Sequence, residues 1–347
     1  MSPFKNLSFI RKLVQVAAFV FLIWGGAIVG YYTVDKVSVA LPALSCAFNH
    51  ETSDYCVLIP LQHQTAHRLG EVLASGGTIM QGLMPILITM GTFLLLFVIL
   101  NKAFCGWLCP LGTFQEFLRI IGQKLGLQGY ESVDEKIVQR TRPVKWLILV
   151  FLVLFFPLLT GLGYMGHDMV DPFCKICPSR ILSTLVTGNT DQLVVDNSSP
   201  INLGLSLFAD FLFGLMVALA LTVRQPFCRI CPMLALQAVF RKLGLLRLVK
   251  NASSRCEKCG LCAKACPMDI REIHTEMVKK DVTYPDCTLC GRCVEFCPDE
   301  KVLQLKYAGL PVFSASPAYF KARKKAQTEW ESGKRKAAKA KPEVQPQ

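Results

Sequence analysis

The sequence has little charge for its length. Only 18% of its 347 residues are Asp, Glu, Lys or Arg, whereas about a quarter of a typical soluble domain is charged. Hydrophobic residues make up 52% of the chain, and the mean hydropathy is +0.39. This composition excludes a disordered chain, a small disulfide-stapled secreted domain and an ordinary cytosolic enzyme.

Histidine is also scarce, and its placement argues against haem. The chain has five histidines: His50, His63, His67, His167 and His274. No Cys-x2-Cys pair is followed by histidine, which excludes covalent c-type attachment. None of the five lies within a long apolar run, so paired axial ligands for a b-type haem in a bilayer are missing. We therefore expect no haem.

Four long apolar runs hold the hydrophobic excess. They span about residues 13–32, 79–100, 146–165 and 201–223. Each is long enough to cross a hydrocarbon core of roughly 30 Å as a helix. The first run is longer than a signal-peptide core, so we expect it to be retained. The sequence predicts a mainly α fold with a four-helix integral membrane domain over residues 1–250.

The Lys and Arg residues alternate between rich and poor connections along the chain. The N-terminal segment, the connection between the second and third runs and the segment after the fourth are rich, whereas the other two connections carry two each. Positive loops mark the cytoplasmic side. We expect a multi-pass protein of the bacterial inner (cytoplasmic) membrane with both termini in the cytoplasm.

The net charge of +13 raises the question of nucleic acid, because 38 basic residues face 25 acidic ones. Much of this excess lies in the C-terminal segment 311–347. No nucleic-acid fold motif and no interleaved aromatic residues accompany it. We expect no nucleic-acid partner, and interpret the segment as a basic, disordered tail near an anionic leaflet.

Two cysteine quartets near the C-terminus follow the pattern Cys-x2-Cys-x2-Cys-x3-Cys-Pro. They are Cys256, Cys259, Cys262 and Cys266, then Cys287, Cys290, Cys293 and Cys297. In two-cluster ferredoxins the fourth cysteine of such a run binds the other cluster. The spacing predicts a small α+β domain over residues 251–310 with two [4Fe-4S] clusters. Cluster one takes Cys256, Cys259, Cys262 and Cys297, and cluster two takes Cys287, Cys290, Cys293 and Cys266.

Two alternatives to clusters are weak for these quartets. A zinc ribbon normally uses two pairs of ligands rather than two quartets that each end in proline. Disulfides are disfavoured in a reducing cytoplasm. The quartets therefore indicate a module that moves single electrons.

The other eight cysteines lie just after the apolar runs. Those after the second and fourth runs are Cys105, Cys109, Cys228 and Cys231, called the inner set below. Both of these runs cross from outside to inside, so we expect the inner set at the cytoplasmic face. There it could bind an iron–sulfur cluster or zinc, or remain as reduced structural thiols. The prolines beside it resemble those of the ferredoxin quartets, which favours a cluster.

The cysteines after the first and third runs are expected at the outer face. They are Cys46, Cys56, Cys174 and Cys177, called the outer set below. The segments PFCKICP and PFCRICP, around Cys174 and Cys228, indicate an internal repeat on opposite faces. An oxidising compartment makes disulfides possible here, with Cys46 joined to Cys56 and Cys174 to Cys177. A further cluster and the disulfides are left as equal alternatives.

Three polar side chains are weak candidates for quinone chemistry. Asp210 interrupts the fourth apolar run, where a carboxylate is costly and often marks a cavity or a proton path. His63 and His67 are spaced four residues apart and would share a helix face. A structural hydrogen bond for Asp210 and an ordinary polar loop helix for the histidines are the plain alternatives.

The chain resembles a family of polytopic membrane ferredoxins over about Leu13 to Leu305. Phe104 to Gly112, with its FCGWLCPLG motif, and the ferredoxin quartets carry the resemblance. NapH-type quinol dehydrogenase subunits are most similar, and NosR-type and CcoG/FixG-type proteins are related. The resemblance implies electron transfer between membrane quinol and clusters, with Cys105, Cys109, Cys228 and Cys231 as membrane-proximal cysteines. This chain departs from NapH-type chains in its Cys-x2-Cys-Pro motifs and in the outer set.

The sequence thus predicts a membrane-bound protein that passes electrons between the quinone pool and a redox partner protein or a larger reductase complex. Its cofactors would be two [4Fe-4S] clusters and one or two further clusters at the membrane faces. The alternative is a redox-sensing or maturation factor for a metalloenzyme, which would use the same clusters and the outer cysteines. A passive subunit that scaffolds a reductase is a third possibility. The direction of the electrons is left open.

Overall fold

The computed structural model describes residues 7–29, 44–49, 53–129, 132–188, 190–251, 256, 259–318 and 320–321. Four helical stretches in this part of the chain are long and apolar enough to cross a membrane: Leu7–Trp24, Ile79–Leu100, Glu135–Gly161 and Pro200–Thr222. They match the four predicted runs in order. The first and third begin earlier than predicted, because helix tolerates the basic residues that precede each apolar stretch.

The helices and strands follow the chain in this order. The N-terminal half comprises α1 (Leu7–Val29), β1 (Leu44–Asn49), β2 (Ser53–Cys56), α3 (Leu58–His63), α4 (Glu71–Ala74), α5 (Ile79–Leu100), α6 (Pro110–Lys124), α7 (Glu135–Thr141), α8 (Val144–Leu147) and α9 (Phe156–Gly161). The remainder comprises α10 (Pro172–Ile176), α11 (Pro178–Val186), α12 (Pro200–Thr222), α13 (Pro232–Val239), β3 (Leu246–Lys250), α14 (Leu261–Ala265), α15 (Glu272–Thr275), α16 (Arg292–Glu295), β4 (Leu303–Tyr307) and β5 (Leu310–Ser314).

Short helical segments of other pitch join these elements. The wide, π-helical ones are Gln64–Gly70, Phe104–Leu108 and Ile148–Phe155, and the tight, 3₁₀ ones are His167–Met169, Asp191–Leu193 and Phe227–Arg229. Two of the six contain cysteines of the inner set. Irregular helical turns of this kind often lie at functional sites.

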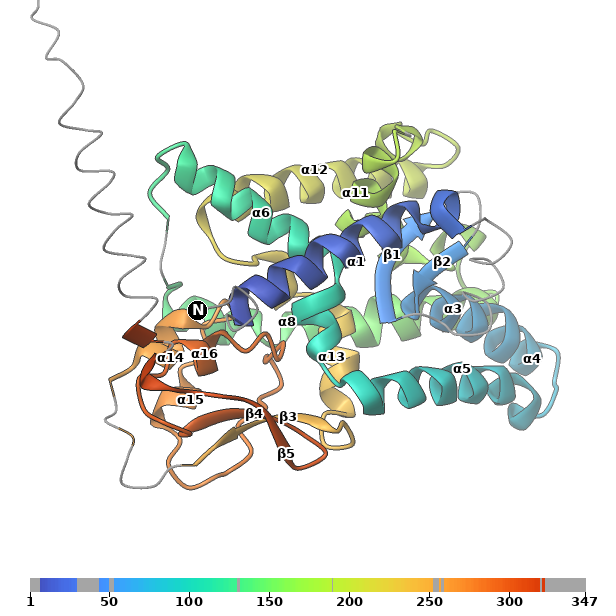
Figure 1. Cartoon of the computed structure of the whole chain (residues 1–347). Coiled ribbons are helices and arrows are strands. Elements are labelled where there is room, and N and C mark those ends of the chain that lie inside the picture. The colour runs from blue at the N-terminus through green and yellow to red at the C-terminus, as the bar shows by residue number, and fades with distance from the viewer. Residues whose placement is uncertain are drawn as a thin grey trace, which may run out of the picture.

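The C-terminal ferredoxin-like elements gather at one end of the molecule (Figure 1). Helix α1 runs from this end, where it contacts α16, toward β1, which it also contacts. The hairpin of β1 and β2 and the helices α3 and α4 lie at the other end (Figure 1). The membrane part therefore lies between the ferredoxin-like unit and this second end.

Cysteine–proline pairs place the membrane cysteines at helix starts. Cys109, Cys177 and Cys231 all adopt extended backbone, with ψ values of 117°, 121° and 123°, and each precedes a proline that opens a helix. Proline suits the first helical position and disfavours helix in the residue before it. The sequence thus fixes the same local conformation at three cysteines in different parts of the fold.

The ferredoxin-like unit combines a three-stranded antiparallel sheet, in the order β3-β4-β5, with the short helices α14 to α16. Gly260 and Gly291 begin α14 and α16 at φ 74° and 75°, a conformation that favours glycine. They occupy equivalent places in the two cysteine quartets. The sheet extends beyond the predicted 251–310, since β3 precedes it.

The predicted disordered tail starts too early at residue 311. Residues 311–314 complete β5, which pairs with β4 through a tight turn at Ala308 and Gly309. Pairing with β4 satisfies backbone groups that a solvated tail would leave to water. Residues 322–347, which hold most of the predicted tail, lie outside the described residues.

Candidate functional site: cysteine sets from the ferredoxin-like unit into the membrane part

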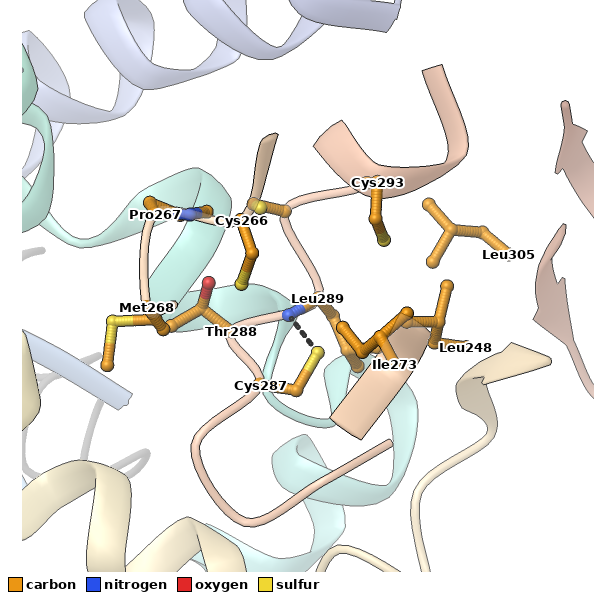
Figure 2. A pocket seen from close by; sticks show the side chains of 12 residues that line it. Leu248, Cys266, Pro267, Met268, Ile273, Cys287, Thr288, Leu289, Cys293 and Leu305 are labelled. Atoms are coloured by element: carbon orange, nitrogen blue, oxygen red, sulfur yellow. Dashed lines mark hydrogen bonds between the residues drawn. The ribbon is translucent and has the colours of Figure 1, made fainter. Parts of the chain in front are cut away.

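The four cysteines predicted for cluster two line one small cavity in the ferredoxin-like unit. They are Cys266, Cys287, Cys290 and Cys293. Figure 2 shows Cys266, Cys287 and Cys293 around this space, with Leu248, Ile273 and Leu305 as apolar lining. The Leu289 amide donates to the Cys287 sulfur at 3.4 Å. This apolar, sulfur-lined cavity suits the group that the spacing predicts.

The cysteines predicted for cluster one also come together. The Cys262 thiol interacts electrostatically with Cys259 and Cys256, and Cys297 interacts with Cys262 and Cys259. Cys293 of the other quartet lies within electrostatic range of Cys262. The crossing of the fourth cysteine between quartets, predicted from the sequence, is therefore consistent with the folded arrangement.

The inner set converges from two distant segments. Cys105 interacts electrostatically with Cys109 and Cys228, and Cys231 with Cys105, Cys228 and Cys109. Burial, together with Cys109, raises the pKa of Cys228 to about 12. Buried thiols ionise readily only beside positive charge, which a bound metal centre supplies.

A buried glutamine tests whether the inner set fits a metal centre. The Cys105 thiol donates to Gln237 Oε1 at 3.0 Å, which leaves Gln237 Nε2 without a partner although this residue is fully buried. The oxygen and nitrogen of an amide can exchange places by a flip. With a deprotonated Cys105, the flipped amide would donate to the sulfur. The orphaned nitrogen thus fits a Cys105 thiolate that binds metal.

The ferredoxin-like unit docks directly on the inner set. A Cβ added to Gly106 would lie 3.1 Å from Cys290 Cα and closer still to the Thr288 carbonyl oxygen. The neighbouring Trp107 donates from its ring nitrogen to the Leu289 carbonyl at 3.0 Å. The loop that carries Cys287 and Cys290 therefore rests on the turn that carries Cys105.

A buried lysine lies near both the inner set and the cluster-two cysteines. Lys102 is fully buried, and its Nζ donates to the carbonyls of Tyr284 and Pro285 at 2.9 and 2.7 Å. Burial lowers its pKa to about 8, while Cys287 and Cys105 oppose the shift. Lys102 thus puts a positive charge within range of one cysteine of each site.

Ion pairs hold the docked arrangement in place. Arg142 Nε lies 3.1 Å from Asp286 Oδ2, and Lys145 also pairs with Asp286. On the other side of the interface, Arg229 lies 2.6 Å from Asp269. Both Lys145 and Asp269 are almost completely buried. The ferredoxin-like unit is therefore anchored to the membrane part rather than tethered by a linker.

The sequence led us to expect the outer set at a surface of its own. In the structure, its described cysteines do not lie apart from the inner set. Cys56, Cys174 and Cys177 pack in the same hydrophobic cluster as Cys105, Cys109 and Cys231. Cys177 interacts electrostatically with both Cys109 and Cys231. The reason is that α10 packs on α12 and α11 on α6, which folds the segment after the third span back into the protein. Cys46 lies in β1, but its side chain is outside the described residues.

The three polar candidates for quinone chemistry, Asp210, His63 and His67, lie on α12, on α3 and in the π-helical segment after α3. Asp210 is half-buried on α12, and its Oδ1 has no partner. His63 and His67 share a face as predicted, with ring centroids 6.0 Å apart, and His67 Nδ1 donates to Glu71 Oε1 at 2.7 Å. His167 lies 5.3 Å from His67, a contact that the sequence gave no signal for.

A cavity of about 630 Å³ lies where α1 and α6 meet the ferredoxin-like unit. Its lining includes six cationic side chains: Arg11, Lys12, Arg119, Arg224, Lys264 and Arg292. Glu116 pairs with Arg11 at 2.5 Å, and although burial opposes the shift, Arg11 and Arg292 hold the pKa of Glu116 below its ordinary value. This charge suits an anionic group better than the neutral ring of a quinone.

Within the described residues, no three His, Cys, Asp or Glu side chains are close enough to chelate one metal ion. In a [4Fe-4S] cluster the cysteine sulfurs are spread around a body of four irons.

Two known domain families match the segments that carry the inner set and the ferredoxin quartets. A 4Fe-4S binding domain matches residues 83–128 and 205–251, and a 4Fe-4S dicluster domain matches residues 248–298. The first covers all of the inner set and the second covers both ferredoxin quartets. Over these segments the chain is similar to ferredoxin-type iron–sulfur proteins. The outer set lies outside the matched segments.

Curated relatives agree with this family. The putative electron transport protein YccM of Escherichia coli is 32% identical over 208 residues, which are 59% of this chain and 51% of YccM. The ferredoxin-type protein NapH of Escherichia coli is 24% identical over 58% of this chain and 60% of NapH. The regulatory protein NosR of Pseudomonas aeruginosa is 28% identical over 60% of this chain and 26% of NosR. The match thus spans about half of YccM and three fifths of NapH, and no solved structure matches the chain.

Three glutamines were missed by the sequence reasoning. Gln62, Gln115 and Gln237 each hydrogen-bond a membrane cysteine. A signal did exist for all three, because Gln62 follows Cys56, Gln115 follows Cys109 and Gln237 follows Cys231 at the same distance of six positions. Polar residues in otherwise apolar stretches beside cysteine motifs point to such partners.

Proposed function

We propose that this protein transfers electrons between the quinone pool and a redox partner protein or larger reductase complex, through sites at the inner set and in the ferredoxin-like unit. The observation that carries the proposal is the contact between the Cys287–Cys290 loop and Gly106. It brings two cysteine sites of different domains together without a mobile linker. Bound at these sites, [4Fe-4S] clusters supply one-electron redox chemistry.

The proposed location is the bacterial inner membrane, with the ferredoxin-like unit and both termini in the cytoplasm. The alternation of basic connections supports this orientation. The start of α1 also lies against the ferredoxin-like unit, since Ser8 bonds Glu295 and Leu7 lies beside Gly291. The N-terminus of α1 and the ferredoxin-like unit therefore share one side of the molecule.

The protein's own residues would hold and tune these sites. Lys102 places a positive charge near both Cys105 and Cys287, which favours the reduced state of a centre held there. Trp107 and the buried ion pairs at Asp286 and Asp269 fix the distance between the two cysteine sites.

The quinone half-reaction needs a proton acceptor as well as an electron acceptor. Oxidation of one quinol to quinone releases two electrons and two protons, and reduction takes up the same numbers. Two successive one-electron transfers would balance it. Asp210, His63 and His67 are the candidate proton groups, and of these three only Asp210 has a buried polar side-chain atom, Oδ1, without a hydrogen-bond partner.

The decisive experiment follows reoxidation of the reduced full-length protein by a water-soluble quinone analogue under anaerobic conditions. Wild type and Cys105→Ser are compared, with the ferredoxin EPR signals as a check that both are folded. The variant keeps the same exposed ferredoxin surface, so its rate measures unspecific oxidation. We expect reoxidation to be much slower in Cys105→Ser. Equal rates would refute the proposed quinone link.

Asp210 gives a second, narrower prediction. Asp210→Asn removes the ionisable oxygen and keeps the shape, so we expect slower quinone-linked reoxidation and a changed pH profile. Ser206→Ala, one turn away on α12, is the matched control and should behave as wild type. An unchanged rate and pH profile in Asp210→Asn would leave Asp210 with a structural role only.

The alternative of a maturation or sensing factor requires outer thiols that a partner can reach. Cys174 is 7% exposed, and burial together with Cys56 raises its pKa well above the ordinary value. Thiol exchange needs an accessible thiolate. The buried position of Cys174 therefore favours the electron-transfer proposal.

A further inference from the structure

The outer set repeats a hydrogen-bond arrangement found at the inner set. Gln115 Nε2 donates to the Cys228 sulfur at 3.5 Å, and its Oε1 accepts from the Phe227 amide at 3.0 Å. Gln62 Nε2 donates to the Cys174 sulfur at 2.9 Å, and its Oε1 accepts from the Phe173 amide at 3.3 Å. Each glutamine thus clamps a Pro-Phe-Cys segment by the same two atoms.

The resemblance extends to the helix that carries each glutamine. Gln115 Nε2 also donates to the Leu111 carbonyl at 3.2 Å, and Gln62 Nε2 to the Leu58 carbonyl at 3.0 Å. Both glutamines are fully buried and lie six positions after a cysteine. By this correspondence Cys56 matches Cys109.

The second cysteines of each pair correspond as well. Cys177 and Cys231 adopt the same extended backbone before a proline that opens α11 or α13. Three members of the inner set, Cys109, Cys228 and Cys231, therefore have counterparts in Cys56, Cys174 and Cys177. The correspondence is one of structure as well as of sequence.

Chain topology explains why the second copy is inverted. The inner set follows the second and fourth spans, and the outer set follows the first and third. Successive spans run in opposite directions, so the two sets are built from segments of opposite orientation. Inverted repeats that build a site where they meet are a recurrent plan in membrane proteins.

The described structure contains no disulfide between Cys174 and Cys177, one of the two that the sequence left open. Cys56, Cys174 and Cys177 are free thiols, and Cys174 is buried against Gln62. Their thiols remain mutual neighbours, since Cys174 interacts with Cys56 and Cys177, and Cys177 with Cys56.

We propose that Cys56, Cys174 and Cys177 hold a further iron–sulfur cluster. Strand β2, which ends at Cys56, pairs with β1, and β1 contacts α11, α6 and the turn that carries Cys105. Each thiol gives up its proton when it binds iron. The inference rests on the proposed function in one respect, namely that the inner set itself holds a cluster.

The position of this site changes the route across the membrane part. Cys177 directly precedes α11, which packs on α6, the helix that directly follows Cys109, so the two membrane sites lie on contacting helices. No mobile carrier is needed between them. The described cysteines of the membrane part and of the ferredoxin-like unit pack in two hydrophobic clusters, and Cys105 packs against both.

The test counts iron and acid-labile sulfide in anaerobically purified full-length protein. Four clusters correspond to about 16 irons per chain. We expect about 12 in Cys174→Ser and about 12 in Cys105→Ser, each with the loss of a different EPR signal. Ser183→Ala, on α11 beside the outer set, is the control for helix damage and should keep the wild-type iron content.

The outcomes separate this inference from the proposed function. Wild-type iron in Cys174→Ser would overturn the inference, and wild-type iron in Cys105→Ser would overturn the inner cluster of the proposed function. If Cys174→Ser does not fold, Gln62→Leu replaces it. Loss of the amide hydrogen bond to the Cys174 sulfur should lower the potential of one cluster without loss of iron, and Gln115→Leu should do so for another. An unchanged set of potentials in Gln62→Leu would equally overturn the inference.

Discussion

Replacing Gly106 with valine is expected to separate the ferredoxin-like unit from the inner set and to slow electron exchange between them. A Cβ at this position meets the backbone of Cys290 at 3.1 Å and the Thr288 carbonyl oxygen still closer. Backbone atoms cannot move aside as a flexible side chain would. Overpacking of this kind costs about 1–3 kcal/mol, and it acts directly on the contact that carries the proposed function.

The measurement is the rate at which reduced full-length protein is reoxidised by the quinone analogue, together with the EPR signals of the ferredoxin clusters. We expect normal ferredoxin signals and a strongly reduced rate in Gly106→Val. Gly91→Val is the matched control, because a Cβ on Gly91 in α5 meets no atom within 4 Å. Equal rates in Gly106→Val and wild type would show that this contact does not serve electron exchange.

Replacing Asp286 with asparagine is expected to weaken docking of the ferredoxin-like unit. Asp286 pairs with both Lys145 and Arg142, and the Lys145 side chain is only 1% exposed. Removal of one partner leaves a buried charge uncompensated, which costs about 3–5 kcal/mol. The loss should appear as a lower midpoint of thermal unfolding in detergent and as faster proteolytic release of the ferredoxin-like unit.

An exposed ion pair in the same unit provides the control. Arg247 and Asp281 lie 3.8 Å apart, with side chains 44% and 46% exposed. Exposed pairs contribute about 0–1 kcal/mol, so Asp281→Asn should shift the midpoint little. If the two variants lose the same small amount of stability, the buried pair is not the anchor of the interface.

The ferredoxin quartets show how much a local pattern can specify. Three ligands within seven residues must wrap one corner of a cluster, and glycines at positions 260 and 291 permit the turn that starts each helix. The membrane spans could also be predicted, because bilayer thickness sets the length of an apolar run. The exact starts of the first and third spans could not be predicted, since each helix includes the basic residues that precede its apolar run.

The placement of the outer set could not be read in this way. From charge and span direction, Cys174 and Cys177 belong to the surface opposite Cys109. In the fold, α10 and α11 turn back against α12 and α6, which brings Cys177 within electrostatic range of Cys109 and Cys231. The direction of a span predicts the side of the membrane at which its helix ends. It does not predict how the segment after the helix packs.

The cysteine quartets, the four apolar spans and the Cys-Pro helix starts could all be predicted from the sequence, because each depends on spacing within a few residues or on the length of one run. Three other features became visible only in the folded protein. The ferredoxin loop packs on Gly106, Gln62 and Gln115 hydrogen-bond equivalent cysteines, and described cysteines of the inner and outer sets pack in one hydrophobic cluster. These features join residues more than fifty positions apart. They depend on how whole helices pack, and packing is set by shape and burial over the entire fold rather than by any local pattern.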